Sequence, residues 1–111
     1  MKAQEIIERY ARGERYFPFV NLSYENFEGM NLRDINLSSA DLANVNFKGA
    51  NLTGANLENA ILIGADFDYA NLDNANLNHA NMQDAWLFYT KFSNASTICT
   101  NLNGVNIEEA L

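Results

Sequence analysis

The stretch from Ala40 to Met82 reads ADLANVNFKGANLTGANLENAILIGADFDYANLDNANLNHANM, and its pattern recurs every five residues. A leucine, a phenylalanine or, at the end, a methionine occupies every fifth position from Leu42 to Met82, and we name this the centre position. Asparagine or aspartate precedes nearly every centre, and alanine mostly stands two residues before it. The same register extends outward from Phe17 to Ile107, with Thr97 as its single polar centre.

A period of five fits neither an α-helix nor a flat strand. Residues five apart on a helix would point about 140° apart, and on a flat strand they would face opposite sides. The chain must therefore bend once per repeat, always in the same direction, so that every centre points toward a common axis. Glycine, asparagine and aspartate dominate the position two after the centre, and these residues tolerate the left-handed backbone of tight turns. The sequence predicts a solenoid.

The length of one coil is indicated by the phenylalanines. Four bends of about 90° would close a coil after about twenty residues, within the range typical of solenoid repeats. Phe27, Phe47 and Phe67 are spaced by twenty, so their rings would stack inside such a coil. The predicted core contains Phe27, Phe47, Phe67, Leu42, Leu52, Leu57, Leu62, Leu72 and Leu77.

The first residues differ from the repeats. Residues 3 to 12 carry an apolar stripe at helical spacing, and Gly13 follows as a plausible C-terminal cap. We assign residues 1–14 to a capping α-helix over the first coil and residues 15–111 to the solenoid.

Glu25 conflicts with the repeat because it occupies an inward position two residues before a centre. A buried carboxylate without a partner is unfavourable. We therefore expect the N-terminal helix to bring Arg9 or Arg12 against Glu25.

Composition narrows the class of function. The net charge is −7, and after residue 15 three bases stand against eleven acids, which argues against binding nucleic acid or an anionic membrane. The single cysteine, Cys99, excludes an internal disulfide framework and a multi-cysteine metal site. There is no secretory signal and no apolar run long enough to span a membrane. We expect a cytoplasmic protein without a cofactor.

Repeats such as ANLTG (50–54), ANLEN (55–59) and ADFDY (65–69) resemble the A(N/D)LXX signature of the pentapeptide-repeat family. The resemblance covers residues 15 to 110. It implies an all-β, right-handed quadrilateral β-helix, of about twenty residues per coil, with a short N-terminal capping α-helix. It also implies a bacterial, notably cyanobacterial, source and no common enzymatic activity. Some members of the family mimic DNA and bind type II topoisomerases.

Adding twenty to a residue number gives its expected neighbour on the next coil. Tyr69 and Tyr89 then share one column, and Trp86, Phe88 and Tyr89 point outward around an inward Leu87. Clustered exposed aromatic residues often mark an interface, although a distorted C-terminal coil covering them is an open alternative. With two outward isoleucines around the corner, the candidate interaction surface consists of Ile61, Ile63, Tyr69, Trp86, Phe88 and Tyr89.

Two other groups of residues suggest weaker hypotheses about function. His79, Cys99 and Asn59 share a column, which is the residue set of a cysteine hydrolase, but a regular solenoid wall provides neither a pocket nor an oxyanion site. A wall carrying Asp66 and Asp68 is acidic, yet its acids are sparse for a mimic of DNA. We predict no catalytic and no metal-binding residue.

The ends of a solenoid expose unpaired backbone unless they are covered. Only four residues follow Ile107, so we expect another copy to cover the C-terminal coil, in a symmetric homodimer through residues 87–111, or the coil to fray. The function we favour is a non-catalytic module for protein–protein contact with an unidentified partner. The alternatives are a DNA-mimicking regulator of gyrase and, more remotely, a Cys–His hydrolase.

Overall fold

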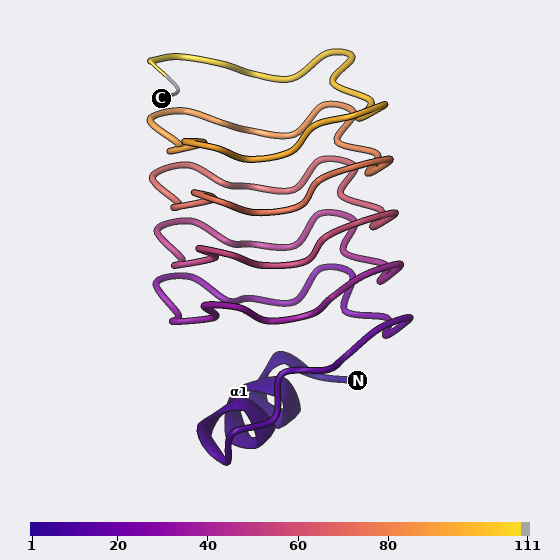
Figure 1. The fold of residues 1–111 in the computed structure, drawn as a ribbon, viewed down its shortest axis with the longest axis vertical. Helices are drawn as coiled ribbons and strands as arrows, with labels where there is room; N and C mark the ends of the chain where they lie inside the picture. The colour runs from indigo at the N-terminus through magenta and orange to yellow at the C-terminus, as the bar shows by residue number, and fades with distance from the viewer. Residues whose placement is uncertain (110–111) are drawn as a thin grey trace.

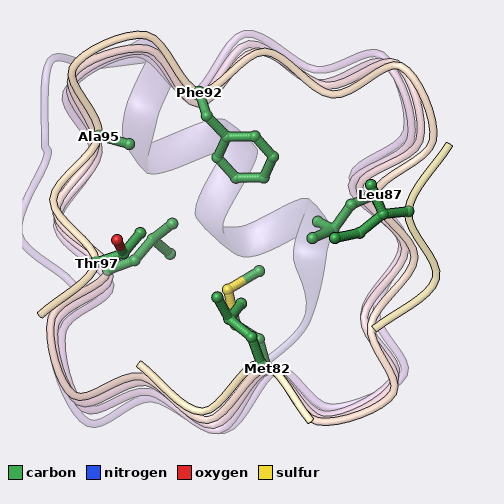
Figure 2. Close-up of a pocket in the computed structure, with 8 residues that line it drawn as sticks. Met82, Leu87, Phe92, Ala95 and Thr97 are labelled. Atoms are coloured by element: carbon green, nitrogen blue, oxygen red, sulfur yellow. The ribbon is translucent and has the colours of Figure 1, made fainter. Parts of the chain in front are cut away.

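The computed structural model describes residues 1–109 and consists of one helix followed by a stack of coils (Figure 1). The helix, α1, spans Ala3–Ala11. After it, the described chain forms isolated parallel bridges instead of longer strands, from Tyr16 with Asn36 to Trp86 with Asn106. Each bridge joins residues twenty positions apart, so each coil takes four five-residue repeats. Figure 2 looks along the stack and shows the four-sided outline of the coils.

Most repeats bend by the same local chemistry, which the repeat around Leu52 illustrates. The Asn51 side chain accepts a hydrogen bond from the backbone N–H of Thr53 at 3.0 Å. The Ala55 N–H donates to the Leu52 carbonyl at 2.9 Å and closes a four-residue turn. Gly54 has φ +72 at the third residue of this turn, which a type II turn requires. The asparagine, the small inward alanine and the permissive turn residue are thus the parts of one bend.

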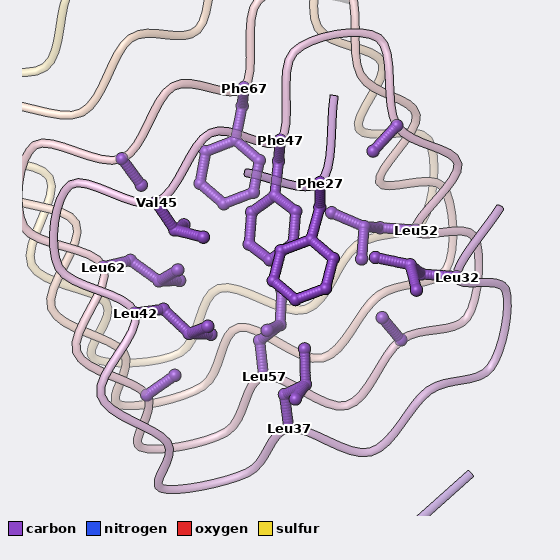
Figure 3. Packing of buried hydrophobic residues seen from close by; sticks show 14 of the residues in the cluster. Phe27, Leu32, Leu37, Leu42, Val45, Phe47, Leu52, Leu57, Leu62 and Phe67 are labelled. Atoms are coloured by element: carbon purple, nitrogen blue, oxygen red, sulfur yellow. The ribbon is translucent and has the colours of Figure 1, made fainter. Parts of the chain in front are cut away.

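The core is a column of centre side chains with small alanines at the corners (Figure 3). Phe27, Phe47 and Phe67 stack along the axis, with ring centroids 5.5 and 5.4 Å apart, which confirms the twenty-residue coil. The fully buried centres include Phe27, Phe47, Phe67, Leu42, Leu52, Leu57, Leu62, Leu72 and Leu77.

The helix α1 lies across the first coil and closes the N-terminal end of the core (Figure 1). Ile6 is completely buried against the centre residues, and the Tyr10 hydroxyl donates to the Arg33 carbonyl at 2.8 Å. Gly13, at φ +98, ends the helix, because its N–H donates to Tyr10 and the next N–H, that of Glu14, donates to Arg9.

The predicted partner of Glu25 is wrong. The Glu25 carboxylate accepts a hydrogen bond from the backbone N–H of Ala3 at 2.6 Å, in the first turn of α1. Arg9 instead pairs with Glu14 at 3.0 Å, and this hydrogen bond is the main reason that the pKa of Arg9 is raised. A helix N-terminus presents free N–H groups and a partial positive charge, so it satisfies a carboxylate without a basic side chain.

Candidate functional site

The candidate surface lies on one side of the solenoid, which we name the third wall. It is the outward side of the repeats centred on Phe27, Phe47, Phe67, Leu87 and Ile107. On each of these repeats the residues before and after the centre point outward, so the wall is a regular grid of side chains. The bridge between Asp66 and Trp86 places their backbones directly against each other on adjacent coils.

Four residues of the third wall form what we name the aromatic patch: Tyr69, Trp86, Phe88 and Tyr89. The rings of Tyr69 and Tyr89 stack, with centroids 5.2 Å apart and planes 9° from parallel. Trp86 meets Phe88 edge to face at 5.8 Å. Tyr69 is 59% exposed and Trp86 42%, so the patch presents apolar surface that the described chain leaves uncovered.

Two carboxylates, those of Asp66 and Asp68, lie on the coil of Tyr69, one coil before Trp86 and Phe88. Asp66 accepts a hydrogen bond from the Asp68 N–H, and Asp68 accepts one from the Phe88 N–H, both at 2.9 Å. Neither carboxylate forms an ion pair within residues 1–109. Lys48 occupies the same column as Asp68 one coil earlier, but it makes no ion pair with Asp68. The aromatic rings therefore border unneutralised acids.

The Asp68–Phe88 hydrogen bond replaces a turn contact that the repeat of Trp86 lacks, and this role of Asp68 was not predicted from the sequence. Trp86 stands where most repeats have the asparagine that binds the turn N–H, and Asp68 supplies the missing acceptor from the previous coil. The same substitution occurs where Lys91 and Ser96 replace the asparagine, with Asp73 and Asn78 as acceptors. The signal is in the sequence: an acid or amide stands twenty residues before Phe88, Ser93 and Ile98, whereas Ala43 stands there for the turn after Ile61.

Ile61 and Ile63 do not join the aromatic patch. They flank the buried centre Leu62 on the neighbouring wall, where Ile61 bridges Asp41 and Asn81. Both are exposed, but the third wall begins only after the corner at Gly64. The structure thus brings together four of the six predicted surface residues and leaves these two as a separate pair.

The column that contains His79 and Cys99 is an open surface. Both side chains are exposed, and the hydrogen bonds of residues 1–109 include none between them. The same part of the chain contains no cluster of three or more His, Cys, Asp or Glu side chains placed to hold a metal ion. Within residues 1–109, the search for a helix that could span a bilayer found none.

The C-terminal end of the core forms what we name the terminal pocket, a cavity of about 400 Å³ (Figure 2). Its lining is mostly apolar, with Thr97 as a polar member, and Leu102 and Ile107 are 43% and 60% exposed although they are centre residues. The walls of the pocket are formed by Leu77, Met82, Leu87, Phe92, Ala95, Thr97, Leu102 and Ile107.

A second group of exposed aromatic residues lies on the first coil, and it was missed as a candidate surface. Tyr16, Phe19 and Tyr24 are all strongly exposed. Phe19 and Tyr24 stand two residues after a centre, with φ of +61 and +64, so the outward rule that found Tyr69 and Tyr89 also identifies them.

Comparison with known proteins gives one family. A model described as the pentapeptide repeat region matches residues 36–111. HetL, a pentapeptide repeat protein involved in heterocyst differentiation regulation in the cyanobacterium Nostoc sp. strain PCC 7120, is 34% identical over 95% of this chain, with a TM-score of 0.58. The chain spans 46% of the length of HetL.

Two further structures are similar. A second pentapeptide repeat protein from Nostoc PCC 7120 is 28% identical, with 96% of each chain covered and a TM-score of 0.53. Rfr23 from the cyanobacterium Cyanothece 51142 is 32% identical over 86% of this chain and 63% of its own, with a TM-score of 0.47. The search of curated proteins found no match. The chain belongs to the family of pentapeptide repeat proteins.

Proposed function

We propose that this protein is a non-catalytic interaction module whose rigid solenoid, a right-handed quadrilateral β-helix as in its family, presents the aromatic patch to a protein partner. The observation that carries the proposal is the exposure of Trp86 and Tyr69 on a wall held by backbone ladders on both sides. Aromatic side chains dominate binding energy at interfaces, and a surface that is already ordered loses little entropy on binding.

The test is affinity capture from native lysate of the source organism. We expect wild-type protein to retain a partner that the double variant Trp86→Ala, Phe88→Ala loses. The matched control is Phe19→Asn, Tyr24→Asn, which removes two exposed aromatic rings at the other end and places asparagine where the backbone is left-handed. Identical captured proteins for the wild type and the Trp86, Phe88 variant would contradict the proposal.

We further propose that the protein forms a symmetric homodimer through its C-terminal coil, residues 87–111, of which 110 and 111 lie outside the described residues. The terminal pocket supports this, because it is apolar and open. The backbone N–H groups of Thr97, Leu102 and Ile107 also have no acceptor within residues 1–109. Since α1 covers the opposite end, stacking through the open ends stops at two copies.

Light scattering coupled to size exclusion checks the dimer. We expect a mass of twice the 12.4 kDa of one chain, and a single-chain mass for the variant Leu102→Asp, Ile107→Asp, which puts charges into the contact. The exposed-residue variant Asn103→Asp, on the same coil, serves as the control and stays dimeric. A single-chain mass for the wild type at the highest concentration reached would refute the dimer.

A further inference from the structure

We propose that the partner segment recognised by the third wall carries arginine, whose guanidinium stacks on the open face of Tyr69 and pairs with Asp66 and Asp68. The inference rests on the proposed function, because it names the chemistry of the partner that the aromatic patch would bind. The occupant to which it commits is an arginine-bearing protein segment.

The first support is an uncovered ring face. Tyr69 stacks on Tyr89 with its plane nearly parallel, so the opposite face of the Tyr69 ring points toward the preceding coil. In that coil the same column position is Gly49, and a Cβ built there would meet nothing within 4 Å. Gly29 continues the column in the same way. The column position one coil before the tyrosine, roughly 4.8 Å away, therefore carries no side chain, and we name this open position beneath the ring the slot.

The second support is charge. Asp66 and Asp68 are half-buried, are held in place by hydrogen bonds to backbone N–H groups, and have no cationic partner within residues 1–109. Glu108 lies exposed beyond Phe88 in the same column. Lys48 is the one base on this wall among the described residues. A cationic partner would thus neutralise carboxylates that this chain leaves unpaired.

The combination selects arginine over lysine. A guanidinium is planar, stacks on aromatic faces and donates a fork of hydrogen bonds that fits a carboxylate, whereas an ammonium is a strongly hydrated point charge. The chain itself makes such contacts elsewhere: the guanidinium carbon of Arg15 lies 3.5 Å from the centroid of the Tyr10 ring, and that of Arg9 lies 5.0 Å from the Phe17 centroid.

The experiment uses the single tryptophan as a reporter, because Trp86 lies within the aromatic patch. The full chain is titrated with a short peptide of alternating glycine and arginine, and with the same peptide carrying citrulline or lysine instead. We expect a saturable change in Trp86 emission with the arginine peptide, affinity weaker by several-fold with lysine, and no change with the neutral citrulline. Binding should weaken as salt is raised.

The chain offers a closely matched pair of variants. Asp66→Asn with Asp68→Asn removes two charges from the third wall and keeps the side-chain oxygens that accept hydrogen bonds. Asp41→Asn with Asp73→Asn makes the same changes at the same repeat positions on other walls, where these oxygens bind Ala43 and Ser93. We expect about tenfold weaker binding for the first pair and less than about twofold for the second.

A third variant tests the slot. Gly49→Asn fills the space beneath Tyr69 with a residue that the left-handed backbone tolerates. It should weaken binding of the arginine peptide as much as the loss of both aspartate charges does. Gly29→Asn, one coil further from Tyr69, should leave binding unchanged. Equal losses for the two aspartate pairs, or equal affinity for arginine, lysine and citrulline peptides, would overturn the inference. If the Trp86, Phe88 variant loses its captured partner while the arginine peptide does not bind, the proposed function stands and this assignment of the partner's chemistry fails.

Discussion

Replacing Phe47 with alanine is expected to destabilise the protein by about 3 to 5 kcal/mol, the range for emptying a large core position. Phe47 is the middle ring of the buried stack and packs against a phenylalanine on each side (Figure 3). Its ring centroid lies 5.5 Å from that of Phe27 and 5.4 Å from that of Phe67. The cavity would therefore interrupt the ring contact between three successive coils, which would then share only the buried leucine centres and alanines beside the stack. Urea unfolding followed by circular dichroism measures the loss as a lower midpoint.

The control for this prediction is Phe47→Leu. Leucine occupies the neighbouring centre Leu52 and many others, so it fits the coil and leaves a smaller cavity, at a loss of roughly 1 to 2 kcal/mol. If the alanine and leucine variants lost the same stability, cavity volume would not explain the effect. A loss below about 1 kcal/mol for alanine would mean that the coils repack around the gap.

The second large effect is expected at the opposite end, from Ile6→Ala in α1. Ile6 is completely buried and is the main apolar contact of a helix of nine residues, a length that is marginal in isolation. Losing it should cost about 2 to 4 kcal/mol and release the helix from the first coil. Hydrogen exchange at the α1 amides, with thermal unfolding, gives the measurement.

Glu8→Ala provides the comparison within the same helix. Glu8 is exposed, so its replacement should change stability by less than about 0.5 kcal/mol. Unchanged protection of the α1 amides in Ile6→Ala would show that the helix is held by its other contacts, such as the hydrogen bond from Ala3 to Glu25.

The features that the five-residue repeat determines could be predicted from the sequence. The contacts between the first coil and α1 could not. The spacing of Phe27, Phe47 and Phe67 suffices to place the ring stack, because every coil repeats the same geometry. The partner of Glu25 depends on how α1 lies on the first coil, which the repeat does not specify. Sequence reasoning considered only side chains as partners, and the group found there is a backbone N–H.

The candidate site likewise has features that the repeat predicts and features that it does not. Outward positions and the addition of twenty predict the Tyr69–Tyr89 pair, because columns are a property of the coil. The terminal pocket could not be predicted, since its volume depends on how the last centre side chains pack rather than on their register. The role of Asp68 required a comparison of two coils, which the pattern within one repeat does not suggest.

The bridges between residues twenty apart set a rule for how this molecule can change length. Insertion of one five-residue unit before Asp66 would keep every centre inside, yet it would turn all later coils by a quarter revolution about the axis. Trp86 and Phe88 would then lie on a different side from Lys48 and Gly49. The third wall would thus be divided between two sides of the solenoid. Insertion of a whole coil of twenty residues would keep every later side chain on its original side of the solenoid. Folding therefore permits changes of length in steps of one repeat, whereas recognition through the third wall permits them only in steps of four repeats.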